Sequence, residues 1–195
     1  MAGEGARTER CVWGDCASTD ANDRKRHGFA RTATHIRRVS FQRHLLIDGA
    51  NILHAWQELR TLLRTDRDAA RSKLLQRAAA IHDYEQVRVT IVHDGRGDEI
   101  VVERPSGQLT LSVVFTPSSM TADDVIEQMV SAASDPGACV VATEDRAMRE
   151  TVTAAGGATM HAEDLRAWVE RAEGRQGGAV KALREANERK WRRHE

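Results

Sequence analysis

The spacing of apolar residues along the chain changes at about residue 44. Before that point, Gly, Ser, Thr, Asp and Arg are mixed with few large apolar residues and show no sustained period. After it, short apolar runs alternate with longer segments in which apolar residues recur every three or four positions. Short runs are typical of buried strands, and the wider spacing is typical of helices with one buried face. The pattern therefore predicts a folded α/β domain preceded by a tail.

Strands are expected where the apolar runs fall, with one weaker strand in the polar connector after the second run. Their predicted ranges are 45–48, 87–94, 99–103, 109–115, 138–145 and 158–161. Helices are expected over 50–63, 66–85, 121–133, 145–155, 162–173 and 179–195. Because strands alternate with helices throughout, we expect βαβ units that build a mostly parallel sheet with helices on both faces.

Single residues mark the faces and ends of several helices. Trp56 shares a face of helix 50–63 with Ile, Leu and Leu at helical spacing, and Trp168 also has apolar neighbours, so both are expected in the core. Asp66 is the expected N-cap of helix 66–85. Thr121 is the expected N-cap of helix 121–133, and Asp124, three positions later, fits a variant of the capping box.

Charge is distributed unevenly in a chain whose formal net charge is zero. Residues 1–44 and residues 166–195 each carry 9 Lys/Arg against 5 Asp/Glu, whereas residues 45–165 carry 11 against 19. Basic ends can hold phosphate backbones, although ends that are merely solvated are an equal alternative. We therefore expect a basic tail without a regular fold (1–43), a folded domain (44–173) and a basic C-terminal helix (174–195), the last separated by an interruption at Gly174, Gly177 and Gly178.

Composition narrows the class of protein further. Aromatic residues make up 4% of the chain, which argues against a recognition surface of stacked aromatic rings. No window has the apolar region of a signal peptide or the length of a membrane span. The three cysteines, Cys11, Cys16 and Cys139, form no disulfide framework. We therefore expect a cytoplasmic protein that has no membrane partner.

Four aspartates lie at or just beyond the ends of the predicted strands. Asp48 closes the first apolar run, Asp94 closes the second, and Asp145 follows the run over 139–142. Asp123 lies in the first turn of the helix after strand 109–115. Ligands of open parallel sheets bind outside the carboxyl ends of the strands, so we expect these four carboxylates to converge there.

Such a convergence predicts a metal site. Clustered carboxylates repel one another unless a cation neutralises them, and hard oxygen ligands suit Mg²⁺ or Mn²⁺ rather than zinc. Two such ions can hold the attacking and leaving oxygens of a phosphodiester. Each aspartate alone could instead cap a helix or interact with the helix dipole. The prediction of a metal site therefore depends on all four aspartates meeting at the same edge of the sheet.

Other kinds of phosphate chemistry fit the sequence less well. The chain has neither a G-x-x-x-x-G-K-[ST] loop nor a G-x-G-x-x-G turn after a strand. A phosphatase of the haloacid-dehalogenase type requires a second Asp two positions after the first, where this chain has Ala50. A small-molecule phosphohydrolase is therefore the weakest alternative, and an RNA-binding or adaptor module without catalysis is the stronger one.

Four segments, LLIDGANILHAWQEL, VTIVHDGR, TADDVIEQMV and VVATEDRAMRE, together resemble the YacP-type NYN domains, a branch of the PIN-like metal-dependent ribonucleases. The likeness covers roughly residues 44–175, and the combination of D-G-x-N with T-A-D-x-x-I-E is its most specific part. The resemblance implies a Rossmann-like α/β/α sandwich. It also implies an endoribonuclease that uses Mg²⁺ or Mn²⁺ and leaves a 5′-phosphate and a 3′-hydroxyl.

The resemblance also implies roles for particular residues. The expected catalytic and metal-binding residues are Asp48, Asp94, Asp123 and Asp145. Asn51 would orient Asp48 or touch the scissile phosphate, with capping of the first helix as an equal alternative. Thr121 would orient the Asp123 segment, and Thr143 begins the short polar element, Thr143-Glu144-Asp145, that the family has after its fourth strand.

Three further charged residues lie close to the predicted site. Glu127, four residues after Asp123, could bind metal or water, although a surface glutamate is as good an interpretation. Arg96 and Arg146 could steer phosphate, although solvated arginines are the simpler interpretation. The expected partner is RNA, and a role within an RNA-bearing complex or a homo-oligomer stays open.

Overall fold

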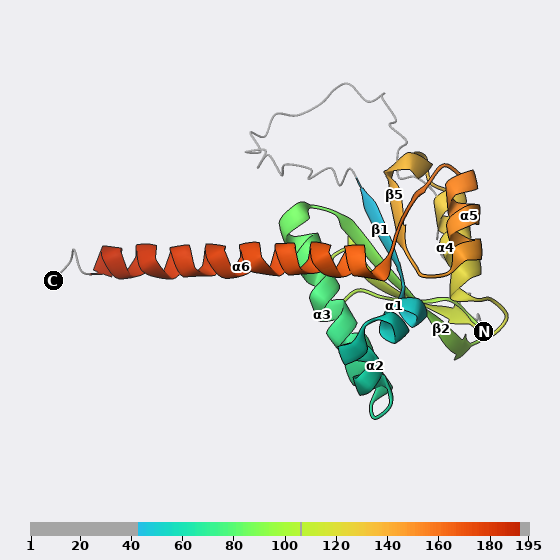
Figure 1. Ribbon diagram of the computed structural model, residues 1–195, viewed down its shortest axis with the longest axis horizontal. Helices are drawn as coiled ribbons and strands as arrows, with labels where there is room; N and C mark the ends of the chain where they lie inside the picture. Colours follow the sequence, from blue (N-terminus) through green and yellow to red (C-terminus); the bar gives the residue numbers. More distant parts are fainter. Residues whose placement is uncertain (1–42, 106, 192–195) are drawn as a thin grey trace, which may run out of the picture. The chain divides into compact units, whose positions relative to one another are not determined.

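The structure is a computed structural model that describes residues 43–105 and 107–191 (Figure 1). The predicted basic tail therefore lies outside the described residues except for Arg43. Within the described ranges, all six predicted strands are present, and the helices follow the predicted order.

Six strands form one sheet in the order β3-β4-β2-β1-β5-β6. All neighbouring pairs are parallel except β3 with β4. The expected mostly parallel sheet is thus confirmed, and the weak strand in the polar connector is its antiparallel edge. The strands are β1 (His44–Asp48), β2 (Arg88–Gly97), β3 (Val101–Glu103), β4 (Leu111–Pro117), β5 (Cys139–Ala142) and β6 (Ala158–Met160).

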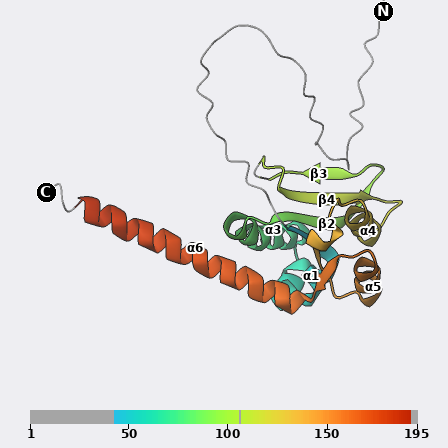
Figure 2. The ribbon, with the colours of Figure 1, turned by 90° about the horizontal axis from the view of Figure 1, so that it is seen from above.

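Helices cover both faces of the sheet and bury a separate apolar core on each. One core joins Leu45 and Ile47 of β1 to the helices α1, α2, α3 and α6, and the other joins Leu46 of β1 to α4 and α5 (Figure 2). Alternate residues of a strand face opposite sides, so β1 contributes to both cores. The helices are α1 (Gly49–Ala55), α2 (Gln57–Leu63), α3 (Arg67–Glu85), α4 (Ala122–Ser131), α5 (Arg146–Ala154) and α6 (Ala162–Trp191).

The two predicted N-caps, Asp66 and Thr121, are confirmed. Asp66 accepts a hydrogen bond from the Ala69 amide (2.9 Å) and caps α3. Thr121 and Asp124 form the predicted capping box of α4, with reciprocal side-chain to backbone bonds of 3.1 and 2.9 Å. Both motifs join residues three positions apart, so the local sequence is sufficient to specify them.

The continuous helix predicted over 50–63 is wrong, because the chain breaks at Trp56. This residue has extended backbone angles (φ −80°, ψ 121°) and separates α1 from α2. Its indole is fully buried and donates a hydrogen bond to the Ala162 carbonyl (2.9 Å), at the start of α6. The predicted core position of Trp56 is confirmed, and that long-range bond accompanies the break.

The interruption predicted at Gly174, Gly177 and Gly178 is also wrong, since α6 is one helix of 30 residues. Glycine is about 1 kcal/mol less favourable than alanine in a helix, but its backbone amide still donates the helical hydrogen bond. The helix can therefore continue through the three glycines when the residues on both sides are helical. No described helix, α6 included, is both long enough and apolar enough to cross a membrane.

Candidate active site

The structure brings the four aspartates together at the carboxyl edge of the parallel strands. Asp48 ends β1, and Asp94 lies in β2, two positions beyond the residue that pairs with Asp48. Asp145 precedes α5 directly after β5, and Asp123 is the second residue of α4. The strand order reverses at β1, since β2 and β4 lie on one side of it and β5 and β6 on the other. Such a reversal is where ligands bind in open α/β sheets. We call Asp48, Asp94, Asp123 and Asp145 the carboxylate cluster.

Asp48 is the most rigidly held member of the cluster. Its side chain is buried (1% exposed) and caps α1, with Oδ1 accepting from the Asn51 amide at 3.1 Å. Its other oxygen, Oδ2, accepts from Asn51 Nδ2 and from Thr143 Oγ1, the latter at 3.1 Å. Asp48, rather than Asn51, therefore caps the first helix, and Asn51 orients the Asp48 carboxylate.

Thr143 links two members of the cluster. It is fully buried, and its hydroxyl donates to Asp48 Oδ2 while accepting from the Asp145 amide at 3.0 Å. Asp145 is half-buried, and its Oδ1 accepts from the Met148 amide (3.0 Å), which caps α5. The capping interpretation of Asp145 is therefore correct, and the same loop holds its carboxylate beside that of Asp48.

Asp94 joins β2 to the start of α4. Its side chain is exposed, and Oδ1 accepts from the Ala122 amide at 2.9 Å. The next residue, Gly95, lies so close to the Thr116 carbonyl that a β-carbon there would overlap it. This packing fixes the backbone at Asp94 and places its carboxylate near Asp123, the neighbour of Ala122.

Asp123 carries the least compensated charge of the cluster. It is half-buried, and among the described residues no hydrogen-bond donor reaches its carboxylate. Burial, followed by the charges of Asp48, Asp145, Asp94 and Glu127, raises the pKa of Asp123 to about 6. The negative charges therefore interact strongly, and Glu127 belongs to the same electrostatic environment.

The chemistry of the cluster suits a divalent cation. Carboxylate oxygens are the ligands that Mg²⁺ and Mn²⁺ prefer, and a cation would relieve the repulsion that adds to burial in raising the pKa of Asp123. Within the part of the chain that the structure describes, no three His, Cys, Asp or Glu side chains already form a group able to hold a metal ion. Hydrogen bonds to Asp48, Asp94 and Asp145 instead direct one or both oxygens of each toward protein donors.

The remaining predicted site residues surround the cluster without completing it. Thr121 is exposed and caps α4, which orients the helical turn that carries Asp123. Arg96 is exposed near the end of β2, and Arg146 forms an ion pair with Glu150 on its own helix (2.9 Å).

His93 and Glu144 support the site in ways that the sequence did not indicate. Burial and the charge of Arg71, opposed by Asp94, lower the pKa of His93 to about 4. Its ring lies against the backbone of Gly49, where an added β-carbon would overlap it. Glu144 accepts from the Ala162 amide (2.7 Å), so it anchors the Asp145 loop to α6. These partners are 44 and 18 positions apart, beyond the reach of local patterns.

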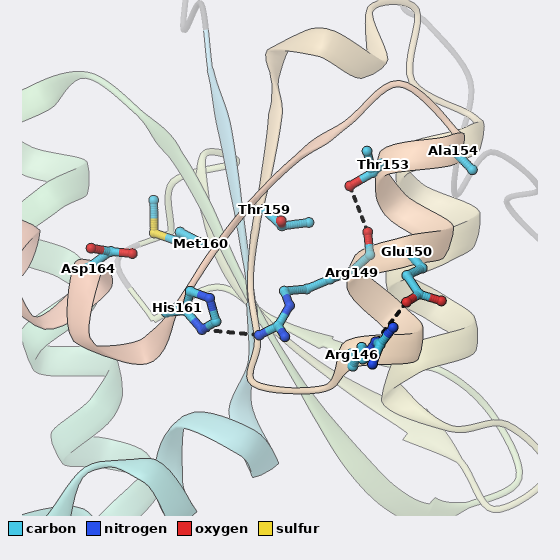
Figure 3. Close-up of a pocket in the computed structure, with 9 residues that line it drawn as sticks. All are labelled: Arg146, Arg149, Glu150, Thr153, Ala154, Thr159, Met160, His161 and Asp164. Carbon is cyan, nitrogen blue, oxygen red and sulfur yellow. Dashed lines mark hydrogen bonds and ion pairs between the residues drawn. The ribbon is translucent and has the colours of Figure 1, made fainter.

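A hollow of about 670 Å³ lies beside the cluster, between α5 and the turn from β6 to α6 (Figure 3). None of the four aspartates lines it. Its arginines already have partners: Arg146 pairs with Glu150, and Arg149 lies 3.1 Å from His161 Nδ1 and 4.0 Å from Glu144. Despite its size, this hollow is therefore a weaker candidate than the carboxylate cluster.

Comparisons with known proteins agree with this architecture. The model of the YacP-like NYN domain family matches residues 45–195. YacP of Bacillus subtilis (strain 168) is 30% identical over 135 residues, which cover 67% of this chain and 77% of that protein. The crystal structure of Rae1 (YacP) from Bacillus subtilis superposes with a TM-score of 0.61 at 29% identity, covering 73% of this chain and 82% of that one. A single-residue mutant of the same protein gives 0.62 at 28% identity, covering 73% and 84%.

Proposed function

Since the chain belongs to the YacP-like NYN domain family, we propose that it is a metal-dependent endoribonuclease that hydrolyses RNA phosphodiesters at the carboxylate cluster. Family membership and the PIN-like fold imply a function connected with RNA. The observation that supports hydrolysis is the convergence of four chain-distant carboxylates. Burial, followed by the charges of the neighbouring acids, raises the pKa of Asp123 to about 6. Such mutual repulsion is unfavourable for folding and is retained where a cation and a reaction require it.

The residues of the site would have two kinds of role, metal binding and orientation of the carboxylates. Asp48, Asp94, Asp123 and Asp145 would hold one or two Mg²⁺ or Mn²⁺ ions. When bound, such ions supply charge neutralisation at the phosphate and a more acidic water molecule. The chain itself orients the carboxylates, because Asn51 and Thr143 fix Asp48 and the Ala122 amide fixes Asp94.

The proposal is tested by removing one charge without removing a hydrogen bond. In Asp94→Asn, the amide oxygen can still accept from the Ala122 amide, so the fold should persist while a metal-binding charge is lost. We expect wild type to cleave RNA with Mn²⁺ or Mg²⁺, leaving a 5′-phosphate and a 3′-hydroxyl. Asp94→Asn should lose about a hundredfold or more in rate.

Asp124→Asn is the matched control, since it removes a neighbouring carboxylate that is exposed and serves the capping box. It should lower stability only slightly, because the amide oxygen can still accept from the Thr121 amide, and it should leave cleavage unchanged. Undiminished cleavage in excess EDTA, or by Asp94→Asn, would show that the cluster does not act through a metal.

An RNA-binding module without catalysis is the second candidate. It is favoured by the finding that the described side chains, as they stand, form no group of three ready to hold a metal. This alternative predicts that RNA binds but remains intact with every divalent cation tested, and that Asp94→Asn binds RNA as well as wild type or better.

A further inference from the structure

Three arginines lie beside the carboxylate cluster on the Asp94 side, away from the hollow of Figure 3. Two hollows of about 200 and 520 Å³ share Arg67, Arg71 and Asp94 among their lining residues. Arg96 lines the larger of the two. We call the two hollows together the Arg71 groove. Because Asp94 lines both, a ligand in the groove would extend directly to the cluster.

Arg71 has unused capacity to donate hydrogen bonds. Its Nε is buried without a hydrogen-bond partner, and its one hydrogen bond runs at 3.4 Å to the Asp94 carbonyl. Among the described residues it forms an ion pair with Asp68 at 3.7 Å, and the Asp68 side chain is 93% exposed, so that pair contributes little. The guanidinium stacks over the Phe115 ring, 5.2 Å from its centroid, which holds it in place. A fixed guanidinium with free donors suits a phosphate group.

The neighbouring arginines also lack neutralising partners. Arg67 and Arg96 are exposed, and neither has an ion pair with any residue of the described ranges. The arginines in the hollow of Figure 3 differ, since Arg146 and Arg149 already face glutamates. The larger hollow is lined by Arg67, Arg71 and Arg96 and by Asp68 and Asp94, so its lining has an excess of positive charge that attracts anions.

The smaller hollow adds a different kind of surface. Ala50, Leu53 and Leu63 form an apolar wall, and the imidazoles of His54 and His93 lie beside it. An apolar wall with imidazoles next to arginines suits an unstacked base, as in proteins that bind single-stranded RNA.

We propose that the Arg71 groove binds a nucleotide next to the scissile phosphate of a single-stranded RNA, with its phosphate on the three arginines and its base in the smaller hollow. This inference rests on the proposed function. It adds that the RNA is bound as a single strand and names the surface that holds the nucleotide on the Asp94 side of the site. The RNA would continue from the groove across Asp94 to the cluster.

The test measures binding of the full chain to a fluorescein-labelled single-stranded RNA in EDTA, by anisotropy over a range of salt. The double variant Arg67→Gln/Arg96→Gln removes two exposed charges, so its fold should be intact. We expect it to bind about tenfold more weakly, with the salt slope reduced by about 0.7 for each phosphate that the variant no longer neutralises. Arg71→Lys, which keeps the charge but not the fork of donors, should also bind more weakly.

Two comparisons make the result specific to the groove. The control double variant Lys73→Gln/Arg104→Gln removes two exposed charges from residues that line neither hollow, and it should bind like wild type. A duplex of the same sequence should bind more weakly than the single strand, because its bases are stacked and inaccessible.

Equal losses in the two double variants, or equal affinity for duplex and single strand, would overturn the inference. Cleavage that proceeds normally in Arg67→Gln/Arg96→Gln at limiting RNA would overturn it as well, while leaving the proposed function intact. If wild type binds RNA through these arginines but does not cleave it, the proposed hydrolysis is contradicted and RNA binding in the Arg71 groove is supported.

Discussion

At the scale of single residues, the site depends on close packing around Asp48. Gly49 follows it directly, and the absence of a side chain there allows α1 to begin against the His93 ring. The sequence made Asp48 conspicuous because an apolar run ends on it. It could not show that His93 and Thr143 complete the arrangement, because these contacts join residues 44 and 95 positions apart.

Gly49→Ala should therefore destabilise the protein by about 1 to 3 kcal/mol, since the added methyl group must displace His93 or the backbone of β2. Gly174→Ala is the matched comparison, because nothing lies within 4 Å of the new methyl group and the residue is helical. That change should stabilise by up to about 1 kcal/mol. Urea unfolding of both variants measures the difference, and shifts of the same sign would contradict the packing described for Gly49.

At the scale of elements, the sequence predicted helix ends that depend on nearby residues and did not predict those that depend on contacts between distant residues. The capping residues of α3 and α4 were predictable because each bonds three positions along the chain. The break between α1 and α2 was not predictable, because Trp56 donates to the Ala162 carbonyl, 106 positions later, and its ring contacts the guanidinium groups of Arg77 and Arg166. The two arginines also share Glu58, so this contact ties α2, α3 and α6 together.

Trp56→Phe tests the role of that bond. It keeps an aromatic ring but loses the donor to the Ala162 carbonyl and some volume, so we expect a loss of about 1 to 3 kcal/mol. Trp191→Phe, in an indole that is 77% exposed, should change the free energy of unfolding by less than about 0.5 kcal/mol. Thermal unfolding compares the two variants. An unchanged melting temperature in Trp56→Phe would show that the contact of Trp56 with α6 does not stabilise the fold.

At the scale of the whole molecule, the alternation of strands and helices predicted the sandwich, and the rule for open parallel sheets predicted where the acids meet. Both predictions succeed because they depend on topology rather than on particular contacts. The Arg71 groove depends on such contacts, since it combines residues of α1, α2, α3, β2 and β4. Nothing in the spacing of Arg67 and Arg71 distinguishes them from solvated arginines.

The carboxylate cluster has an energetic consequence for the whole fold. The pKa of Asp123 is about 6 in the folded protein and ordinarily 3.8, so the folded state binds a proton more readily than the unfolded state between these values. Without divalent cations, stability therefore falls as the pH rises through this window and remains reduced above pH 6. A bound cation would restore it by neutralising the ionised cluster.

The most direct measurement is therefore the unfolding free energy and RNA cleavage of Asp123→Asn, side by side with wild type at pH 7. We expect the variant to be at least as stable as wild type in EDTA, to gain less stability from Mn²⁺, and to lose cleavage. A variant that is less stable than wild type in EDTA, or that cleaves RNA at the wild-type rate with Mn²⁺, would contradict the account of a cation-dependent carboxylate cluster.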